Sequence, residues 1–243
     1  RSRNLNLFTL LSLEHKQYED RNLNSRARKT VDAVVLGTTG DFRDSVLGGG
    51  VNTYELSVAS GQLKYPDGRN PALDDDERYT KLNYGYTRLQ DLVTGRALLY
   101  AAVRGQYAAN NLDTTEQFRV GGPDGVRAFA TGEGTGDIAT VATLELRVLP
   151  PEDWLGRIAR EMVFSVFADG GYVQYRYRPR GSADPNARRN HARFGGAGIG
   201  LAWVRPNDYA LRLSIARPVA GQASSEDDRK KIRVYLQAAM LFN

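Results

Sequence analysis

Hydrophobic and polar residues alternate with a period of two along most of the chain, in ten runs, most of about 10 to 14 residues. The runs cover 4–18, 29–38, 50–62, 79–90, 95–108, 137–149, 162–177, 194–204, 208–219 and 230–242. Such alternation is typical of β-strands with one apolar face and one polar face. In the last run, for example, Val234 and Leu236 share one face, whereas Arg233 and Gln237 share the other. The pattern therefore predicts an all-β protein built from ten strands.

Three features favour a transmembrane antiparallel β-barrel over a soluble β-sandwich. The runs exceed the usual strand length of about 5–6 residues. Their polar faces carry charges in mid-strand, as a water-filled lumen allows: Glu55, Arg104, Glu145, Asp169 and Arg212. Long and short connections also tend to alternate, which is typical of outer-membrane barrels. The long ones are 19–28, 63–78, 109–136, 178–193 and 220–229; 91–94 and 205–207 are short, and 39–49 and 150–161 are intermediate.

Composition excludes several classes of protein. The longest stretch without a charged residue has eleven residues, Phe194 to Val204, whereas a membrane-spanning helix needs about 20. The 243 residues include no cysteine and two histidines, and the net charge is +5. His15 and His191 lie far apart in the sequence and define no catalytic unit. We therefore expect no enzyme, no metal site and no cofactor.

The chain ends and the 150–161 connection carry further expectations. No signal peptide precedes the first run, so we expect a processed chain or a piece of a longer protein. The residues from Pro150 to Arg160 could begin a helix, but we expect an ordered turn anchored by Trp154 at the membrane interface. Aromatic residues near run ends suggest interfacial girdles: Tyr18, Tyr79, Tyr107, Tyr172, Tyr175 and Tyr209.

The connection 109–136 is the most informative segment. It has about 28 residues without strand patterning, and loops of that length are commonly functional or disordered. It contains the motif Phe118-x-x-Gly121-Gly122-x-x-x-Val126-Arg127-x-Phe129, followed by Gly132-Glu-x-x-Gly136-Asp137. The apolar residues among these glycines predict a compact loop that packs on its own side chains. A second motif, Phe167-x-Asp169-x-Gly171, lies in the seventh run.

These motifs, in this order among the strands, resemble those of the two-partner secretion transporters (TpsB proteins). That family belongs to the superfamily of outer-membrane polypeptide translocases and assembly factors. The resemblance covers essentially the whole chain, as strands seven to sixteen of a sixteen-stranded barrel. It implies that residues 1–243 are the C-terminal part of the barrel domain, with six further strands and two POTRA domains upstream. The Met240 and Phe242 pattern resembles a barrel-assembly signal, although Asn243 departs from the family's aromatic end.

The resemblance also implies that the loop occupies the lumen and that Arg127 pairs with Asp169. Alternation places Phe167, Asp169 and Gly171 on one strand face, which must be the lumen side because a charge facing lipid is costly. The neighbouring run presents Gly196, Gly198 and Gly200 on one face, and we expect these small residues to seat the loop. No helix follows them, which excludes a nucleotide-binding loop. Ala128 replaces the family's usual Gly, so the loop tip could differ locally.

The implied function is export of an unfolded, TpsA-like exoprotein across the bacterial outer membrane, with membrane lipid and lipopolysaccharide as further partners and no nucleic acid. One alternative is an assembly factor that inserts other barrels; another is a passive porin or a barrel lipase. A lipase is disfavoured by the missing Ser/His constellation, and a porin by the structured loop.

The acidic run Leu73–Arg78 could bind a cation, but a solvated charge run is favoured. An arginine-rich stretch is interpreted as a solvated loop, with contact to lipopolysaccharide phosphates as the alternative: Arg176, Arg178, Arg180, Arg188, Arg189 and Arg193.

Overall fold

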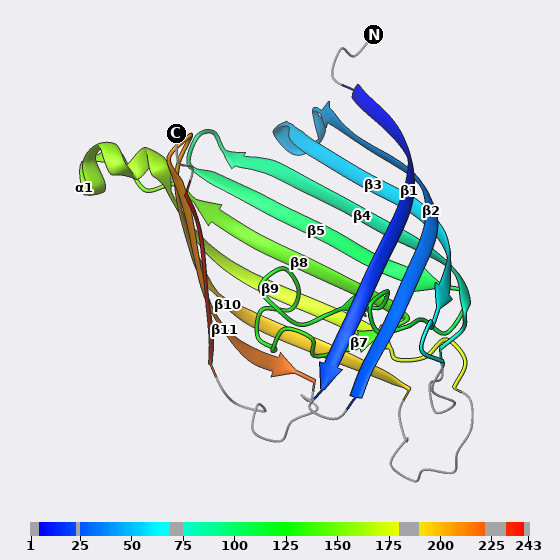
Figure 1. Cartoon of the computed structure of the whole chain (residues 1–243). Helices are drawn as coiled ribbons and strands as arrows, with labels where there is room; N and C mark the ends of the chain where they lie inside the picture. Colours follow the sequence, from blue (N-terminus) through cyan, green and yellow to red (C-terminus); the bar gives the residue numbers. More distant parts are fainter. Residues whose placement is uncertain (1–4, 23–24, 69–74, 180–189, 222–231, 241–243) are drawn as a thin grey trace.

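Ten strands form one antiparallel sheet, in the order β1-β2-β3-β4-β5-β8-β9-β10-β11-β12 (Figure 1). The computed structural model describes residues 5–22, 25–68, 75–179, 190–221 and 232–240. The strands are β1 (Leu5–Asn22), β2 (Ser25–Asp44), β3 (Gly50–Lys64), β4 (Arg78–Val93), β5 (Ala97–Ala108), β8 (Ile138–Val148), β9 (Met162–Gln174), β10 (His191–Arg205), β11 (Tyr209–Ala220) and β12 (Arg233–Met240). The prediction of an all-β, ten-stranded antiparallel fold is confirmed. The sheet curves strongly, and β1 and β12 form its two edges.

Several strand boundaries differ from the sequence prediction. The expected long connection 19–28 is wrong, because β1 and β2 pair in register up to Asn22 opposite Ser25. Charged residues made this stretch resemble a loop, yet backbone hydrogen bonds can extend a hairpin wherever both of its faces meet water. The 39–49 connection is shorter than expected, since β2 continues to Asp44 and is followed by the 3-10 turn η1 (Val46–Gly48). The 150–161 connection contains one α-helical turn, α1 (Glu152–Leu155), and the 3-10 turn η2 (Gly156–Glu161).

The two faces of the sheet differ in character, as the alternation predicts. The outer, convex face exposes apolar side chains. Leu144, Val166 and Ile199, for example, have exposed fractions of 52%, 53% and 57%. The inner, concave face carries the mid-strand charges and the segment between β5 and β8 (Figure 1). The connections after β3, β5, β9 and β11 are long and lie at one end of the sheet, together with the tight β1–β2 turn. The short turns after β2, β4 and β10 lie at the other end, together with the 150–161 connection. Long connections mark the extracellular end of outer-membrane barrels, and short turns the periplasmic end. Among the described residues, no helix has the length and apolar character needed to cross a membrane.

The six aromatic residues assigned to girdles divide between the two faces. Tyr107, Tyr172 and Tyr209 lie on the outer face, by their strand registers. The girdle assignment is wrong for Tyr79, which is 2% exposed and packs in an inner cluster with Val31, Leu63, Ala108 and Leu112. Tyr18 packs against the same cluster, and Tyr175 packs against the apolar core of the loop. Alternation within a strand gives the relative faces but does not show which aromatic side chains a loop covers.

Candidate functional site: a loop bound to the inner wall

The segment between Ala108 and Ile138 folds back across the concave face as a long hairpin (Figure 1). Its base is the two-stranded ladder of β6 (Phe118–Arg119) and β7 (Thr135–Gly136). Beyond the ladder, Gly121 N donates to Glu133 O over 2.9 Å, and Val126 N donates to Val120 O over 2.8 Å. Backbone hydrogen bonds within the loop therefore hold its tip in a defined shape, which a disordered connection would lack.

Apolar side chains attach the loop to the sheet. Val120, Val126 and Phe129 are fully or almost fully buried, at 0%, 0% and 2% exposure. They pack in one cluster with Phe167 of β9 and Phe194 of β10. The rings of Phe129 and Phe194 meet edge to face with centroids 4.9 Å apart. The loop thus contributes part of the hydrophobic core on the inner wall.

The Arg127 guanidinium forms a two-pronged ion pair with Asp169 on β9. Arg127 Nε donates to Asp169 Oδ2 and Arg127 Nη2 donates to Asp169 Oδ1, each over 2.9 Å. The Arg127 backbone N–H also donates to Asp169 Oδ2, over 3.1 Å. The Asp169 side chain is 0% exposed and that of Arg127 is 13% exposed. A planar fork matched to a carboxylate is the strongest geometry for such a pair.

Three neighbours on the inner wall complete the site, and the sequence analysis did not assign them to it. Glu145 Oε2 accepts a hydrogen bond from Arg127 Nη1 over 2.9 Å, and Arg147 Nε donates to the other oxygen of Glu145 over 2.9 Å. Thr143 Oγ1 donates to Asp169 Oδ1 over 2.9 Å. The guanidinium also lies 3.2 Å above the ring centroid of Phe167, within the range of a cation–π contact. Alternation of β8 places Thr143, Glu145 and Arg147 on the inner face, and that signal could have identified them.

The small residues of the wall have unequal roles around the loop. A Cβ on Gly171 would collide with Val120 and Val126, and one on Gly196 would lie 2.6 Å from the Cβ of Ala128. A Cβ on Gly198 would instead meet the Phe167 ring and the backbone of β11, and one on Gly200 would meet Ser165. Gly171 and Gly196 therefore lie directly under the loop, whereas Gly198 makes room for the ring beneath Arg127.

Two loop positions show what the backbone requires. Gly122 adopts a φ of +124°, a conformation that side chains strongly disfavour. Ala128 is not among the described non-glycine residues with positive φ, which are Leu47 and Asn207. The replacement of the family's Gly by Ala128 therefore requires no backbone strain, and its methyl group is buried against Gly196.

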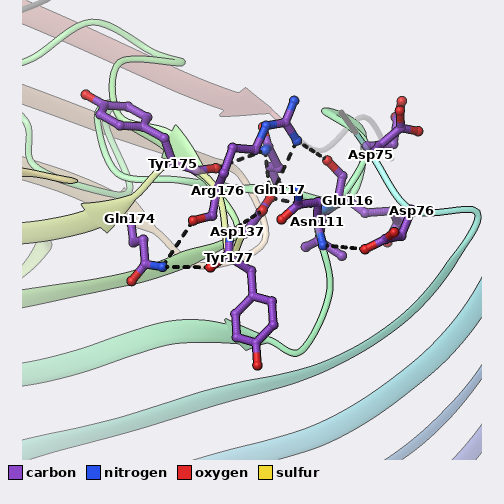
Figure 2. Close-up of polar contacts among 12 residues, drawn as sticks. Asp75, Asp76, Asn111, Glu116, Gln117, Asp137, Gln174, Tyr175, Arg176 and Tyr177 are labelled. Atoms are coloured by element: carbon purple, nitrogen blue, oxygen red, sulfur yellow. Dashed lines mark hydrogen bonds and ion pairs between the residues drawn. The ribbon is translucent and has the colours of Figure 1, made fainter. Parts of the chain in front are cut away.

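Asp137, the last residue of the loop motif, anchors the base of the hairpin (Figure 2). Its carboxylate is 0% exposed and accepts hydrogen bonds from Gln117 Nε2 over 2.8 Å, Tyr177 N over 2.8 Å and Leu112 N over 3.2 Å. Arg176 Nη1 lies 3.9 Å from the same carboxylate and donates to Leu112 O over 2.7 Å. One buried carboxylate thus joins both ends of the loop to the β9–β10 connection.

Further polar contacts join neighbouring extracellular connections to this base. Asn111 exchanges two hydrogen bonds with the backbone of Arg178, each over 2.7 Å, and its own backbone N–H donates to Asp76 (Figure 2). Asp113 accepts two hydrogen bonds from Lys29 Nζ, over 2.8 and 2.9 Å. Burial alone would raise the pKa of Asp113, but Lys29 and Thr115 outweigh it, so that pKa lies below its ordinary value of 3.8. The connections before β4 and after β9 are therefore bound to the loop.

Beside the loop tip, a cavity of about 450 Å³ opens between the loop and the wall formed by β3, β4, β5 and β8. Charged and aromatic side chains line it, among them Glu55, Tyr100, Arg104 and Arg147.

Within the described ranges, no group of three or more His, Cys, Asp or Glu residues is arranged to hold a metal ion. Parts of the sequence predictions lie outside the described residues: Leu73 and Asp74 of the acidic run, Arg180, Arg188 and Arg189 of the basic stretch, and Phe242 and Asn243. Arg176, by contrast, lies in the contacts around Asp137 rather than in a freely solvated loop.

Comparison with known proteins identifies the class to which this fold belongs. The family model of the Omp85 superfamily domain matches residues 11–238, so the chain belongs to the Omp85 superfamily. It is therefore part of an integral β-barrel protein of the bacterial outer membrane, and it is not an enzyme.

Individual relatives are distant. The heme/hemopexin transporter protein HuxB of Haemophilus influenzae strain 86-028NP is 22% identical over 235 residues, which are 93% of this chain and 40% of HuxB. HuxB of Haemophilus influenzae strain KW20 is 21% identical over the same length. Among solved structures, CdiB from Escherichia coli matches 98% of this chain and 50% of its own with a TM-score of 0.58 and 15% identity, a likeness of fold. The chain thus spans less than half the length of the curated relatives it matches.

Proposed function

We propose that this chain is the C-terminal part of a two-partner secretion transporter, which exports an unfolded exoprotein through its barrel. The observation that carries the proposal is the loop fixed to the inner wall by Arg127 and Asp169, since a folded loop held there would plug the lumen, whereas the interior of a porin is a water-filled channel. The similarity to HuxB along 93% of the chain supports it.

The proposal includes the parts that the ten strands lack. A closed ten-stranded barrel would have an interior mostly filled by its own side chains, because barrel width grows with strand number. The loop from 109 to 137 and a translocating chain require more room. We therefore propose that these are the last ten strands of a sixteen-stranded barrel, and that six strands and the POTRA domains precede them in the full protein.

In this proposal the inner-wall residues act together. Arg127, Asp169 and Glu145 hold the loop tip, Gly171 and Gly196 allow it to lie close to the wall, and Asp137 fixes its base. The cavity lined by Glu55, Arg104 and Tyr100 is the lumen space beside the loop. A TpsA-like exoprotein is the substrate, and lipid and lipopolysaccharide surround the outer face.

The test is export by the full-length protein in its native host. A deletion strain is complemented with wild type, with Arg127→Ala or with Glu55→Ala, and the exoprotein encoded beside the gene is quantified in the medium and in the periplasm. We expect the deletion to abolish export and Arg127→Ala to reduce it strongly, whereas Glu55→Ala, a lumen carboxylate outside the Arg127 contacts, retains it. Normal export in the deletion strain, together with falling levels of other outer-membrane barrels, would instead indicate an assembly factor.

A further inference from the structure

The connection between β8 and β9 exposes an unusual group of apolar side chains. Trp154 is 77% exposed, and Leu155 and Ile158 are 40% and 44% exposed. All three lie in α1 and η2, which project from the sheet at the end where the shorter turns lie (Figure 1). Clustered exposed apolar groups usually mark an interaction surface. We name Trp154, Leu155 and Ile158 the rim patch.

Contacts of Glu161 show that this connection is attached to the outer side of the sheet. Glu161, the last residue of η2, accepts hydrogen bonds from Trp203 Nε1 over 2.9 Å, from Arg205 Nε over 3.0 Å and from the Tyr209 hydroxyl over 3.3 Å. The rings of Trp203 and Tyr209 meet edge to face with centroids 5.4 Å apart. Trp203 alternates with Gly196, Gly198 and Gly200 of the inner face, so it lies on the outer face.

The connection that carries the rim patch leaves the sheet beside apolar side chains of the outer face. Val148 of β8 pairs with Phe164 of β9 at the point where the connection leaves the sheet, and both side chains are 43% exposed on the outer face. Farther along the same face, Leu201 and Leu213 line an apolar groove with Phe164. In an integral outer-membrane protein, this surface contacts lipid.

The charges around the rim patch are compatible with a membrane interface. Glu152 forms an ion pair with Arg160, and Glu161 forms one with Arg205. The charges of Glu152 and Glu161 are therefore neutralised. Indole rings favour the headgroup region, where an apolar body and a polar N–H are both accommodated.

We propose that α1 and η2 form an interfacial anchor that binds the phospholipid of the periplasmic leaflet, with the rim patch inserted at the boundary of headgroups and acyl chains. Trp203 and Tyr209 form the edge of the aromatic belt at the same level, and Glu161 fixes the anchor to that belt. The occupant is lipid because the connection joins the sheet beside the exposed outer-face pair Val148 and Phe164 and is fastened to the same face through Glu161. The alternative is that a periplasmic domain of the same protein covers the patch, and the experiment below distinguishes the two.

The test places nitroxide labels on the full-length protein in phosphatidylethanolamine/phosphatidylglycerol vesicles. The chain has no cysteine, so Trp154→Cys, Ile158→Cys and Asp153→Cys each give a single site in it, and Leu213→Cys serves as the lipid-facing reference. Collision rates with oxygen, which concentrates in lipid, and with a water-soluble nickel chelate are then compared by electron paramagnetic resonance. Heat-modifiable mobility on gels verifies that each variant is folded.

We expect the oxygen-to-nickel collision ratio at 154 and 158 to be several-fold above that at 153 and to approach that at 213. Ratios at 154 and 158 equal to that at 153 would place the patch in water and overturn the proposal. Labels at 154 and 158 that are immobilised and inaccessible to both reagents would overturn it as well, because they would show the patch covered by protein.

Discussion

Removal of the Asp169 carboxylate should release the loop tip while leaving the barrel intact. Asp169 accepts four hydrogen bonds, three from Arg127 and one from Thr143, and its side chain is fully buried. Breaking one partner of a buried ion pair typically costs about 3–5 kcal/mol. Glu145 remains beside Arg127 in the Asp169→Ala variant, so we expect a smaller cost, about 2–3 kcal/mol.

That cost should appear as a more frequently open loop. A change of about 2–3 kcal/mol raises the open population about 30- to 150-fold. Val126 lies in the loop tip, and its side chain is 0% exposed. Val126→Cys introduces a smaller side chain, whose thiol reacts only when the loop leaves the wall. The rate of maleimide modification then reports the open population of the folded protein in outer-membrane vesicles.

The comparison uses Val126→Cys alone, with Asp169→Ala, and with Glu55→Ala as a matched control. Glu55 is a carboxylate in the same cavity that makes none of the Arg127 contacts. We expect the rate of maleimide modification to rise about 30- to 150-fold in Asp169→Ala and to stay unchanged in Glu55→Ala. Equal rates in all three proteins would refute the reasoning that this ion pair holds the loop.

Three further outcomes are expected. Gly171→Ala should displace the loop and accelerate Val126→Cys modification, whereas Gly170→Ala, whose new Cβ meets nothing within 4 Å, should not; equal rates would contradict the close approach. Leu213→Arg should reduce the membrane yield of folded protein, because a basic side chain at mid-membrane on the lipid face costs about 2–4 kcal/mol. Ser214→Arg places the same side chain in the lumen and should be tolerated. Equal yields of the two variants would contradict the assigned faces. Since folding lowers the pKa of Asp113, the stabilisation by its carboxylate is present above about pH 4 and is lost as the pH falls through the folded pKa. Pepsin cleavage of 109–117 in the wild type should therefore rise as the pH falls through that pKa. A pH profile of cleavage that Asp113→Asn leaves unchanged would exclude Asp113 as the cause.

The alternation of side chains was sufficient to predict the fold because each strand has one apolar face and one polar face. It gave the ten strands, their antiparallel order and the side of β9 that carries Asp169. It failed at the β1–β2 hairpin, where pairing continues to Asn22 and Ser25 beyond the apolar pattern. Backbone pairing extends the strands there, and it leaves no trace in the pattern of hydrophobic residues.

The site was less accessible to sequence reasoning. Alternation placed Glu145 on the inner face, but no pattern indicates that it shares the guanidinium of Arg127 with Asp169. Likewise, three glycines share one face of β10, and only the path of the loop distinguishes Gly196, which lies beneath Ala128, from Gly200, which does not. Contacts between distant segments depend on how the loop folds, and that is decided by packing of Val120, Val126 and Phe129 rather than by any local pattern.

A double-mutant cycle on Arg127 and Asp169 tests the central claim most directly. Opening free energies are obtained from Val126→Cys modification rates in the wild type, Arg127→Ala, Asp169→Ala and the double variant. We predict that the double variant opens scarcely more than either single variant, with a coupling energy of about 2 kcal/mol. Single effects that add to within about 0.5 kcal/mol would contradict a direct bond between the two side chains as the fastening of the loop.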